Sequence, residues 1–310
     1  MTAYLLDRLT AGPIAALRER VAVVNWDEPG IQDWHEHASA VVVRSSYITA
    51  DDIAKAKRLK LVCKHGVGTE KVALDAAREH GVMVTNVPGG SAQSVAELAL
   101  GLTVAVARPF ALTDRRLRAG LVEDREPFHG QELKGRTLGI AALGELGQAV
   151  LRVFRGAFGM DAIAWAPRTS QEKCEALGAR KVETLDELLA VSDVLVICVP
   201  QTPETIGLFG ETEFRKMKST AIAINVSRGA VWDEVALDRV LASGHLLGAG
   251  ADVFTVEPPP ADHPLVQRDN FVAAPHMGAM TEEALDRVGY TVVEQVAAAL
   301  SGGEPKHRVA

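Results

Sequence analysis

Three side chains with complementary chemistry follow apolar segments in the second half of the chain. Arg228 lies in NVSRGA, Glu257 in DVFTVEPP and His276 in APHMGA. Hydride transfer to a 2-keto acid requires a cation that binds the acid and polarises its ketone, a proton donor for the ketone oxygen, and a carboxylate that keeps this donor protonated. The planar guanidinium of Arg228 suits a carboxylate, and Glu257 beside His276 would orient the imidazole and favour its charged form. The three residue types therefore predict acid–base chemistry of this kind.

Taken one at a time, these residues also have plain structural interpretations. A lone arginine is usually solvated or paired at the surface, and a lone histidine is more often a packed or exposed residue than a catalyst. Each of the three follows a strand of one predicted parallel sheet, and the carboxyl ends of such strands converge on a bound dinucleotide. Their joint placement therefore favours the catalytic interpretation.

A glycine turn suited to a dinucleotide lies between Leu138 and Gly147, in the segment LGIAALGELG. An apolar strand is followed by a tight turn and the start of a helix, whose free N–H groups and positive dipole end suit a pyrophosphate. Gly144 and Gly147 occupy the second and third glycine positions of the G-x-G-x-x-G fingerprint, and Ala142 occupies the first. The same pattern also fits an ordinary strand-to-helix junction, so the surrounding elements must decide.

The elements around these motifs alternate between short apolar strands and helical segments, a pattern typical of parallel sheets covered on both faces. Residues 1–93 and 282–310 are predicted to form a substrate domain, and residues 94–281 a dinucleotide-binding domain. The second of these has six predicted strands, enough for a complete doubly wound dinucleotide domain. The predicted strands begin at Ala3, Val21, Ala40, Leu61 and Val82, and at Thr137, Asp161, Val194, Ala221, Leu247 and Phe271.

The connecting segments carry further expectations. Ser94 and Glu97 have the spacing of a capping box at the start of an apolar helix that reaches about Arg108. Residues 115–135 are charged and rich in helix breakers, and they are predicted to form a surface connection. Residues 281–300 are predicted to form a helix that returns to the first domain, and residues 301–310 are predicted to fray.

Composition limits the classes of partner. Hydrophobic residues make up 47% of the 310 residues, and the net charge of −7, with no Lys/Arg run, argues against nucleic acid and membrane surfaces. No apolar run approaches the roughly 18 residues of a membrane span, and the N-terminus lacks the pattern of a signal peptide. Cys63, Cys174 and Cys198 predict reduced thiols in a cytoplasmic protein, with neither a disulfide framework nor a metal site.

Five segments resemble, in order, the motifs of the D-isomer-specific 2-hydroxyacid dehydrogenases, a family that includes phosphoglycerate dehydrogenase and glyoxylate/hydroxypyruvate reductase. They lie between Ser45 and Thr281, and Asp252 follows Arg228 by 24 positions, a spacing that fits the family. The resemblance implies an α/β oxidoreductase with two doubly wound parallel-sheet domains, in which a Rossmann dinucleotide domain is inserted in a flavodoxin-like substrate domain. It also implies a homodimer formed through the dinucleotide domain. The segments read HGVGTEKVALDAAREHGVMVTNVPGG, VPQTPETIGLF, NVSRGAVWDEVAL, DVFTVEPPP and APHMGAMT.

The same resemblance implies roles for individual residues. Arg228, Glu257 and His276 would be the catalytic set, and Asp252 would hold the nicotinamide carboxamide. The substrate would be bound by Arg44, Val67, Gly68, Arg228 and His276. The cofactor would be bound by Gly144, Glu145, Leu146, Gly147, Ala166, Arg168, Thr169, Ser170, Val199, Pro200, Thr205, Val226, Ser227, Asp252 and His276.

The end of the second strand of the dinucleotide domain predicts the choice of cofactor. Ala166 stands 22 positions after Gly144, where the fingerprint places an acid about 20 residues on that binds the ribose 2′-OH of NAD. Arg168, Thr169 and Ser170 follow at once and could bind a 2′-phosphate. The segment therefore predicts a preference for NADP(H), with NAD(H) as the alternative and a solvated Arg168 as the plain structural interpretation.

The segment Val43-Arg44-Ser45-Ser46 bears on the substrate. It resembles a loop that carries two arginines in phosphoglycerate dehydrogenases, and Ser46 stands in the place of the second. This departure predicts a small, unphosphorylated 2-keto acid such as glyoxylate or hydroxypyruvate. The alternatives are an NAD-dependent enzyme of the phosphoglycerate dehydrogenase type and a non-catalytic, dinucleotide-sensing scaffold like the corepressors that resemble this family. Glu257 argues against a formate-type dehydrogenase, because that subgroup differs at this position.

Overall fold

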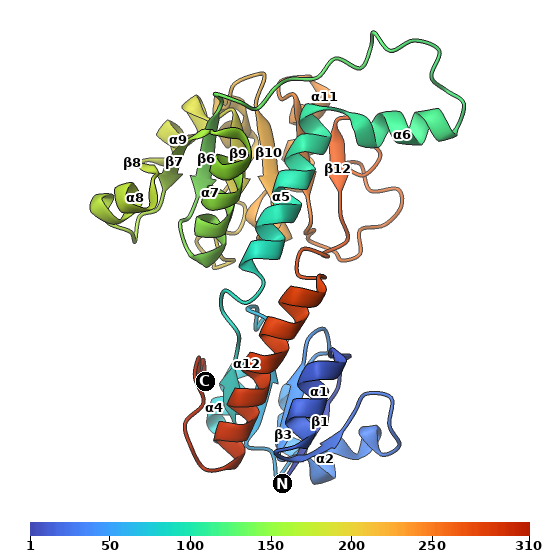
Figure 1. Ribbon diagram of the computed structural model, residues 1–310, viewed down its shortest axis with the longest axis vertical. Helices are drawn as coiled ribbons and strands as arrows, with labels where there is room; N and C mark the ends of the chain where they lie inside the picture. Colours follow the sequence, from blue (N-terminus) through green and yellow to red (C-terminus); the bar gives the residue numbers. More distant parts are fainter. The chain divides into compact units, whose positions relative to one another are not determined.

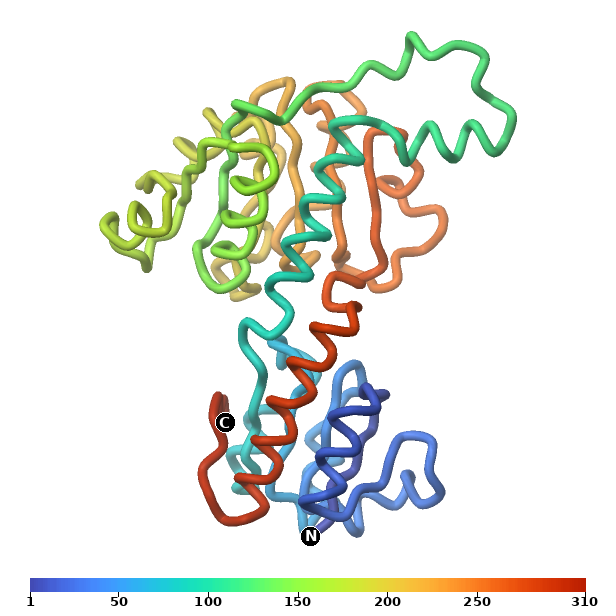
Figure 2. Tube along the Cα trace, viewed as in Figure 1, coloured from blue at the N-terminus to red at the C-terminus, as the bar shows by residue number.

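The structure, a computed structural model, describes residues 1–310 and divides into two compact units (Figure 1). Unit 1 comprises Met1–Ser91 and Met280–Ala310, and unit 2 comprises Ala92–Ala279. Both divisions fall within two residues of the boundaries expected from the sequence. Figure 2 follows the chain as it leaves unit 1, passes through all of unit 2 and returns to unit 1. Each unit is built on one sheet in which every strand pair is parallel, so the predicted fold class is confirmed.

The sheet of unit 1 has five strands in the order β2-β1-β3-β4-β5, which is the flavodoxin-like order. Its central strands are buried along their whole length, as expected for strands covered on both faces. Helices α1 and α12 cover one face, and α2, α3 and α4 cover the other. The strands are β1 (Thr2–Leu5), β2 (Ala22–Val24), β3 (Ala40–Val43), β4 (Leu61–Lys64) and β5 (Met83–Thr85), and the helices are α1 (Ala11–Arg18), the 3₁₀ turn η1 (Ile31–Asp33), α2 (Trp34–His37), α3 (Ala50–Lys55), α4 (Leu74–Glu79) and α12 (Glu282–Leu300).

Helix α12 forms where the sequence predicts a returning helix. Its N-cap Thr281 accepts a hydrogen bond from the N–H of Ala284 at 3.2 Å. Val288, Val292 and Val296 recur every four residues on one face of the helix, and all three are buried against the sheet of unit 1. This apolar stripe explains why the chain returns to unit 1 after unit 2.

The prediction that residues 301–310 fray is wrong. The N–H of Val309 donates to the carbonyl oxygen of Val84 at 2.8 Å, and the N–H of Asn86 donates to that of His307 at 3.2 Å. Thr85 and Arg308 form an antiparallel bridge. Since β5 is an edge strand with unpaired backbone groups on its outer side, the tail satisfies hydrogen bonds that local sequence does not reveal.

The sheet of unit 2 has seven strands in the order β12-β11-β10-β9-β6-β7-β8. The order reverses between β6 and β9, and dinucleotides bind at such switch points. Helices α5, α7 and α8 cover one face, and α9, α10 and α11 cover the other. The strands are β6 (Thr137–Ala141), β7 (Asp161–Trp165), β8 (Arg180–Val182), β9 (Val194–Ile197), β10 (Ile222–Asn225), β11 (Gly248–Ala251) and β12 (Phe271–Ala273), and the helices are α5 (Ala92–Ala107), α6 (Phe110–Arg118), α7 (Glu145–Phe158), α8 (Gln171–Leu177), α9 (Leu185–Val191), α10 (Glu211–Lys216), the 3₁₀ turn η2 (Gly229–Val231) and α11 (Glu234–Ala242).

Unit 2 departs from expectation at β8, which was not predicted. This strand has the sequence RKV and lies at the edge of the sheet. Short, charged segments are weak strand signals, and charged residues are common on edge strands because they discourage pairing with other chains. The sheet therefore has one strand more than the predicted six.

Helices α5 and α6 correct two further expectations. Helix α5 begins at Ala92, so Ser94 lies inside it and the predicted capping box is wrong; Glu97 instead accepts from the side chain of Gln93 at 2.9 Å. The segment after Pro109 continues as α6, whose last turn occupies the start of the predicted surface connection.

No single helix is long and apolar enough to cross a membrane, and only α5 and α6 taken together, with a bend of 67° between them, meet that length and composition.

Candidate active site

Three adjacent strands of unit 2 bring the predicted acid–base residues to one edge of its sheet. Arg228 follows β10, Asp252 follows β11 and His276 follows β12, while Glu257 lies on the connection between β11 and β12. Because the strands are parallel, all of these residues lie at carboxyl ends. The structure therefore brings together side chains that are up to 48 positions apart in the sequence.

His276 and Glu257 form a direct pair. Nδ1 of His276 lies 2.6 Å from Oε2 of Glu257, and Oε1 of Glu257 accepts the N–H of Phe254 at 3.1 Å. Burial alone would raise the pKa of Glu257, but the hydrogen bonds from His276 and Phe254, with the charges of His276 and Arg228, hold it below its ordinary value. The carboxylate is therefore ionised and fixes the imidazole through Nδ1. The imidazole is about half exposed, which leaves Nε2 for a substrate.

A buried carboxylate shapes the turn that carries His276. Asp252 is 3% exposed, and its two oxygens accept the N–H groups of Met277 at 2.7 Å and Gly278 at 2.8 Å. Its own carbonyl oxygen accepts the N–H of His276 at 2.7 Å. Burial raises the pKa of Asp252, against the opposing effect of these N–H groups. His276 is held with φ at 54°, in the left-handed region that few non-glycine residues adopt. The sequence did not predict this positioning role of Asp252.

Asn225 is a site residue that sequence reasoning missed. It ends β10, is fully buried, and donates from Nδ2 to the carbonyl oxygen of Arg228 at 2.9 Å. Its Oδ1 accepts both the N–H and the hydroxyl of Ser227, at 3.0 and 2.9 Å. Nη1 of Arg228 donates in turn to the carbonyl oxygen of Ser227 at 2.8 Å. An asparagine that closes the apolar strand AIAIN was the available signal, because such a side chain must find buried partners.

The glycine turn after β6 has the geometry that a pyrophosphate needs. Gly144 is the N-cap of α7 and offers no side chain, so the first N–H groups of a 14-residue helix stay free of side-chain caps. A Cβ at Gly147 would lie 2.1 Å from the carbonyl oxygen of Ala142, so only glycine allows the helix to pack this closely on the turn. Ala142 replaces the first fingerprint glycine and has φ at 75°. Alanine therefore keeps the turn at some conformational cost.

The predicted 2′-phosphate residues lie together after β7. Ala166 is 4% exposed and packs in the core, and its carbonyl oxygen accepts the N–H of Thr169 at 2.9 Å to close a turn. Ser170 is the N-cap of α8 and accepts the N–H of Lys173 at 3.3 Å. Arg168 is exposed on this turn. It lies near Glu204, whose pKa is lowered by the hydroxyl of Thr202 and, to a smaller extent, by the charge of Arg168.

The remaining predicted cofactor residues follow β9 and β10. Thr205 donates from Oγ1 to the carbonyl oxygen of Pro200 at 2.6 Å and accepts the N–H of Thr202 at 2.7 Å, which fixes the loop after β9. Val199 and Val226 are buried, at 3% and 5% exposure. These residues, like Ser227, thus line the same carboxyl edge as the glycine turn.

Unit 1 presents the predicted substrate residues at the carboxyl ends of its own strands. Arg44 follows β3, where Oδ2 of Asp7 accepts the N–H groups of Arg44, Ser45 and Ser46 at 2.6, 2.9 and 3.0 Å. Val67 and Gly68 follow β4, and their N–H groups make no hydrogen bond to the rest of the chain.

Hydrogen bonds from neighbouring side chains hold the two loops of unit 1, residues 44–46 and 67–68, in place. The hydroxyl of Ser46 donates to Oδ1 of Asp7 at 3.1 Å, and Nζ of Lys64 donates to the carbonyl oxygen of Arg44. The side chain of Asn86 donates to the carbonyl oxygen of Val67 at 2.8 Å. Burial would raise the pKa of Asp7, but the N–H groups of the 44–46 segment, with the Ser46 hydroxyl, hold it below its ordinary value.

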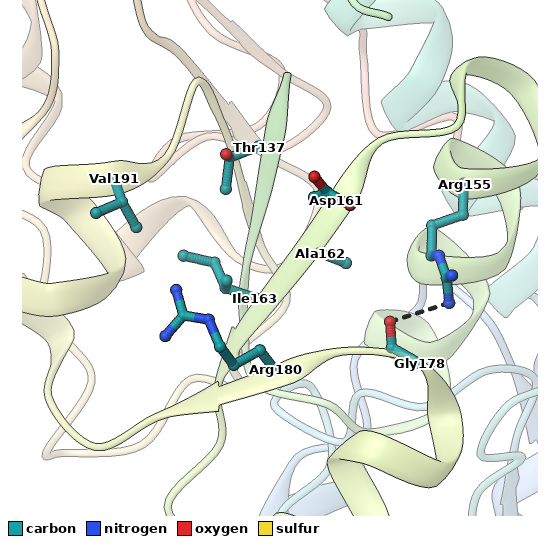
Figure 3. A pocket seen from close by; sticks show the side chains of 8 residues that line it. All are labelled: Thr137, Arg155, Asp161, Ala162, Ile163, Gly178, Arg180 and Val191. Carbon is teal, nitrogen blue, oxygen red and sulfur yellow. Dashed lines mark hydrogen bonds between the residues drawn. The ribbon is translucent and has the colours of Figure 1, made fainter. Parts of the chain in front are cut away.

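The pocket drawn in Figure 3 lies elsewhere on unit 2. It has a volume of about 390 Å³ and is lined by Thr137, Asp161 and Arg180, the first residues of β6, β7 and β8. These are the amino ends of the strands, opposite the edge that carries His276. The guanidinium of Arg155 donates to the carbonyl oxygen of Gly178 at 3.0 Å there and does not face Arg180 (Figure 3). The pocket therefore has no part in the site described above.

Known proteins match this chain at the level of family and fold. The family model "D-isomer specific 2-hydroxyacid dehydrogenase, NAD binding domain" matches residues 100–278. The D-3-phosphoglycerate dehydrogenase of Archaeoglobus fulgidus is 41% identical over 258 residues, which make up 83% of this chain and 48% of that relative. The chain thus spans about half the length of this curated relative.

Two solved structures match over almost the whole chain. A putative D-isomer specific 2-hydroxyacid dehydrogenase from Polaromonas sp. JS6 66 is 31% identical with a TM-score of 0.90, and the match covers 100% of this chain and 99% of that one. A glyoxylate reductase from Paecilomyes thermophila is 28% identical with a TM-score of 0.87, and the match covers 100% and 98% of the two chains.

Proposed function

Because the chain belongs to the D-isomer specific 2-hydroxyacid dehydrogenase family, we propose that it transfers a hydride between a nicotinamide dinucleotide and C2 of a small D-2-hydroxy acid or its 2-keto acid. The observation that carries this proposal is the 2.6 Å contact between Nδ1 of His276 and Oε2 of Glu257, at the carboxyl edge of the sheet that also carries Arg228, whose charge acts on Glu257. An acid–base pair beside a guanidinium is what the reaction requires.

In the reduction direction, His276 donates a proton from Nε2 to the ketone oxygen. The ionised Glu257 stabilises the imidazolium before the transfer and keeps Nδ1 protonated throughout. Arg228 binds the carboxylate of the acid and polarises the ketone. In unit 1, the free N–H groups of Val67 and Gly68 are donors of the kind that suits a carboxylate. In the oxidation direction, the neutral His276 accepts the hydroxyl proton.

A dinucleotide fits the carboxyl edge of unit 2. The N–H groups of Glu145, Leu146 and Gly147 at the start of α7 would bind its pyrophosphate, and Asp252 would meet its nicotinamide carboxamide. When bound, the dinucleotide supplies or accepts the hydride.

Of the two dinucleotides, we favour NADP(H). The side chain of Ala166 carries no charge that would repel a 2′-phosphate, and the exposed Arg168 on the same turn offers a cation. Glu204 near Arg168 works against this preference, because it offers that guanidinium a competing carboxylate. The ratio of kcat/KM with NADPH to that with NADH is the direct measurement.

Two substrate classes remain, and the curated relatives favour the first. The relatives named D-3-phosphoglycerate dehydrogenase support an acid with a phosphate, such as 3-phosphoglycerate. The second class, glyoxylate and hydroxypyruvate, is supported by Ser46, which stands where a second arginine is expected and whose hydroxyl is bound to Asp7. This serine offers no charge to a phosphate.

A panel of acids assayed with both cofactors tests the proposal. The phosphoglycerate type predicts a higher kcat/KM for 3-phosphoglycerate in oxidation than for glycerate, while the reductase type predicts efficient turnover of glyoxylate or hydroxypyruvate. Absence of turnover with every 2-keto and 2-hydroxy acid, alongside tight dinucleotide binding, would instead support the sensing scaffold.

We also propose that the protein forms a homodimer through unit 2. Helix α6 buries none of its residues within the chain. Phe110, Leu117 and Leu121 are 53%, 67% and 69% exposed on α6 and the residues after it. Sedimentation velocity should report twice the mass of the chain, and Leu117→Asp should return the protein to a monomer.

The cytoplasmic location stays a prediction from the three free cysteines.

A further inference from the structure

A second carboxylate–imidazole pair, Glu234 and His263, contacts the loop that carries Glu257. Nε2 of His263 lies 3.2 Å from Oε2 of Glu234, and the two side chains are only 16% and 13% exposed. Oε1 of Glu234 accepts the N–H of Thr255 at 2.7 Å. Thr255 lies two residues before Glu257, so both pairs hold the same short segment, Phe254 to Glu257.

The side chain of Glu234 is not needed to start its own helix. Asp233 is the N-cap of α11, and its Oδ1 accepts the N–H groups of Val235 and Ala236 at 2.9 and 3.0 Å. Glu234 points away from this cap and uses both oxygens on residues more than 20 positions further along the chain. Its partners are therefore long-range ones, and both belong to the connection between β11 and β12.

His263 contacts Phe254, the first residue of this segment. Its ring packs edge-on against Phe254, with centroids 5.6 Å apart, and Phe254 packs in turn against Phe271 at 6.2 Å. The N–H of Phe254 is the donor that holds Oε1 of Glu257. Nδ1 of His263 is buried without a hydrogen-bond partner from the protein, so the ring meets a polar partner through Nε2 alone.

We infer that Glu234 and His263 are positioning residues that hold the Phe254–Glu257 segment where the carboxylate of Glu257 meets Nδ1 of His276. The inference rests on the proposed function. Thr255 is fixed by Glu234, Phe254 is fixed by His263, and the backbone between them and Glu257 transmits both constraints. The charged groups that face Glu257 are His276, Arg228 and Asp252, and the group that faces His263 is Glu234.

The test compares Glu234→Ala with a matched control. Glu213 also lies at a helix start in unit 2 and accepts a backbone N–H, that of Gly210 at 3.1 Å, but it touches no part of the Phe254–Glu257 segment. Glu234→Ala should lower kcat roughly tenfold to a hundredfold, the loss expected when a reacting group is misplaced, with KM for the dinucleotide unchanged. Glu213→Ala should leave kcat as in the wild type. Glu234→Gln, which keeps an acceptor for the N–H of Thr255, should recover part of the loss.

The pH profile separates positioning from a general structural role. If Glu257 is no longer held in place, its carboxylate stabilises the imidazolium of His276 less. The pH above which keto-acid reduction declines should therefore be lower in Glu234→Ala than in the wild type, as it should be in Glu257→Gln. In a Glu257→Gln background, Glu234→Ala should then cost less than about twofold, since residues that act through one contact are not additive. An unchanged profile, or a full additional loss in that background, would overturn the inference.

A second readout does not depend on turnover. In ¹⁵N-labelled protein, the Nδ1–H proton of His276 should resonate far downfield in the wild type and in Glu213→Ala, and should lose that shift in Glu234→Ala. If the wild type turns over no 2-keto acid, the proposed function fails while this signal still decides the positioning role. A retained downfield signal in Glu234→Ala would overturn that role whatever the activity.

Discussion

The backbone of Gly229 lies against that of Phe254, so closely that a Cβ atom at Gly229 would be 2.0 Å from the carbonyl carbon of Phe254. Gly229 directly follows Arg228, and Phe254 donates the N–H that holds Glu257. The spacing between the guanidinium and the acid–base pair is thus set by two backbones in contact, and no side chain larger than hydrogen fits between them.

Gly229→Ala should therefore lower both stability and activity. Forcing a methyl group into a packed contact typically costs about 1–3 kcal/mol, and here it also moves Arg228 away from Glu257. Thermal unfolding and kcat measure the two effects. Gly156→Ala is the matched control, because a Cβ there meets nothing within 4 Å and alanine favours the helix. A stable, fully active Gly229→Ala protein would contradict the close packing.

His276→Ala should lower the rate of keto-acid reduction by roughly two to four orders of magnitude, the range for loss of a general acid. Dinucleotide binding, measured by fluorescence titration, should persist, because the glycine turn and α7 are untouched. Turnover near that of the wild type would show that another group supplies the proton.

Glu257→Gln should shift the pH dependence of turnover. The ionised Glu257 favours the imidazolium of His276, and its own lowered pKa reflects that pairing. Without the charge, the imidazolium loses a stabilising partner, so reduction should decline from a lower pH than in the wild type. The profile of kcat against pH with a saturating keto acid checks this, and an upward or absent shift would count against the pair.

Asp7→Asn should destabilise unit 1 in a pH-dependent way. The pKa of Asp7 is held below its ordinary value, because three N–H groups outweigh the effect of burial. Its stabilisation is therefore complete above the ordinary carboxyl pKa of about 4 and is lost as the pH falls through the lower folded-state value.

At pH 7 the asparagine variant should be less stable by about 1.5–3 kcal/mol, the range for hydrogen bonds to a charged group. The difference in stability should vanish in acid, where the wild-type carboxyl is protonated and is therefore uncharged, like the amide of the variant. Urea unfolding at several pH values measures this, with the exposed Asp51, paired only with Lys55, as the control for Asp→Asn substitution. A difference that persists unchanged in acid would exclude the charge as its cause.

Arg168→Ala should narrow the preference for NADPH over NADH by roughly tenfold to a hundredfold, since one charge-assisted contact is worth about 1.5–3 kcal/mol. Ala166→Asp should weaken NADPH binding by repulsion. Equal use of both cofactors by the wild type, or an unchanged ratio in Arg168→Ala, would place the 2′-phosphate elsewhere. Glu204→Gln removes the carboxylate that competes for Arg168, so it should increase the preference for NADPH over NADH.

The parts of the fold that local patterns encode could be predicted from the sequence. Apolar runs such as AVVV at β3 and VLVI at β9 predict buried parallel strands, and the glycines around Gly144 predict the turn between β6 and α7. Because carboxyl ends of parallel strands share an edge, Arg228 and His276 could be placed together without coordinates.

The parts that escaped prediction depend on distant partners. The tail at His307–Ala310 finds its hydrogen bonds on β5, and Asn225 gains its role from the turn that it ties rather than from its own segment. The three N–H groups bound by Asp7 lie 37 to 39 positions away from it. Charge and periodicity along the chain carry no record of such contacts.

The division of the chain has a consequence for biosynthesis. Unit 2 is one continuous segment, whereas unit 1 needs both Met1–Ser91 and Met280–Ala310. A ribosome therefore delivers β1, β3 and β4 long before α12, whose Val288, Val292 and Val296 cover one apolar face of their sheet. Until that helix emerges, the nascent sheet exposes the part of this face that α12 covers, a surface of the kind that chaperones bind. Unit 2 can complete its folding first, and unit 1, whose first segment is translated before unit 2, is completed only after it.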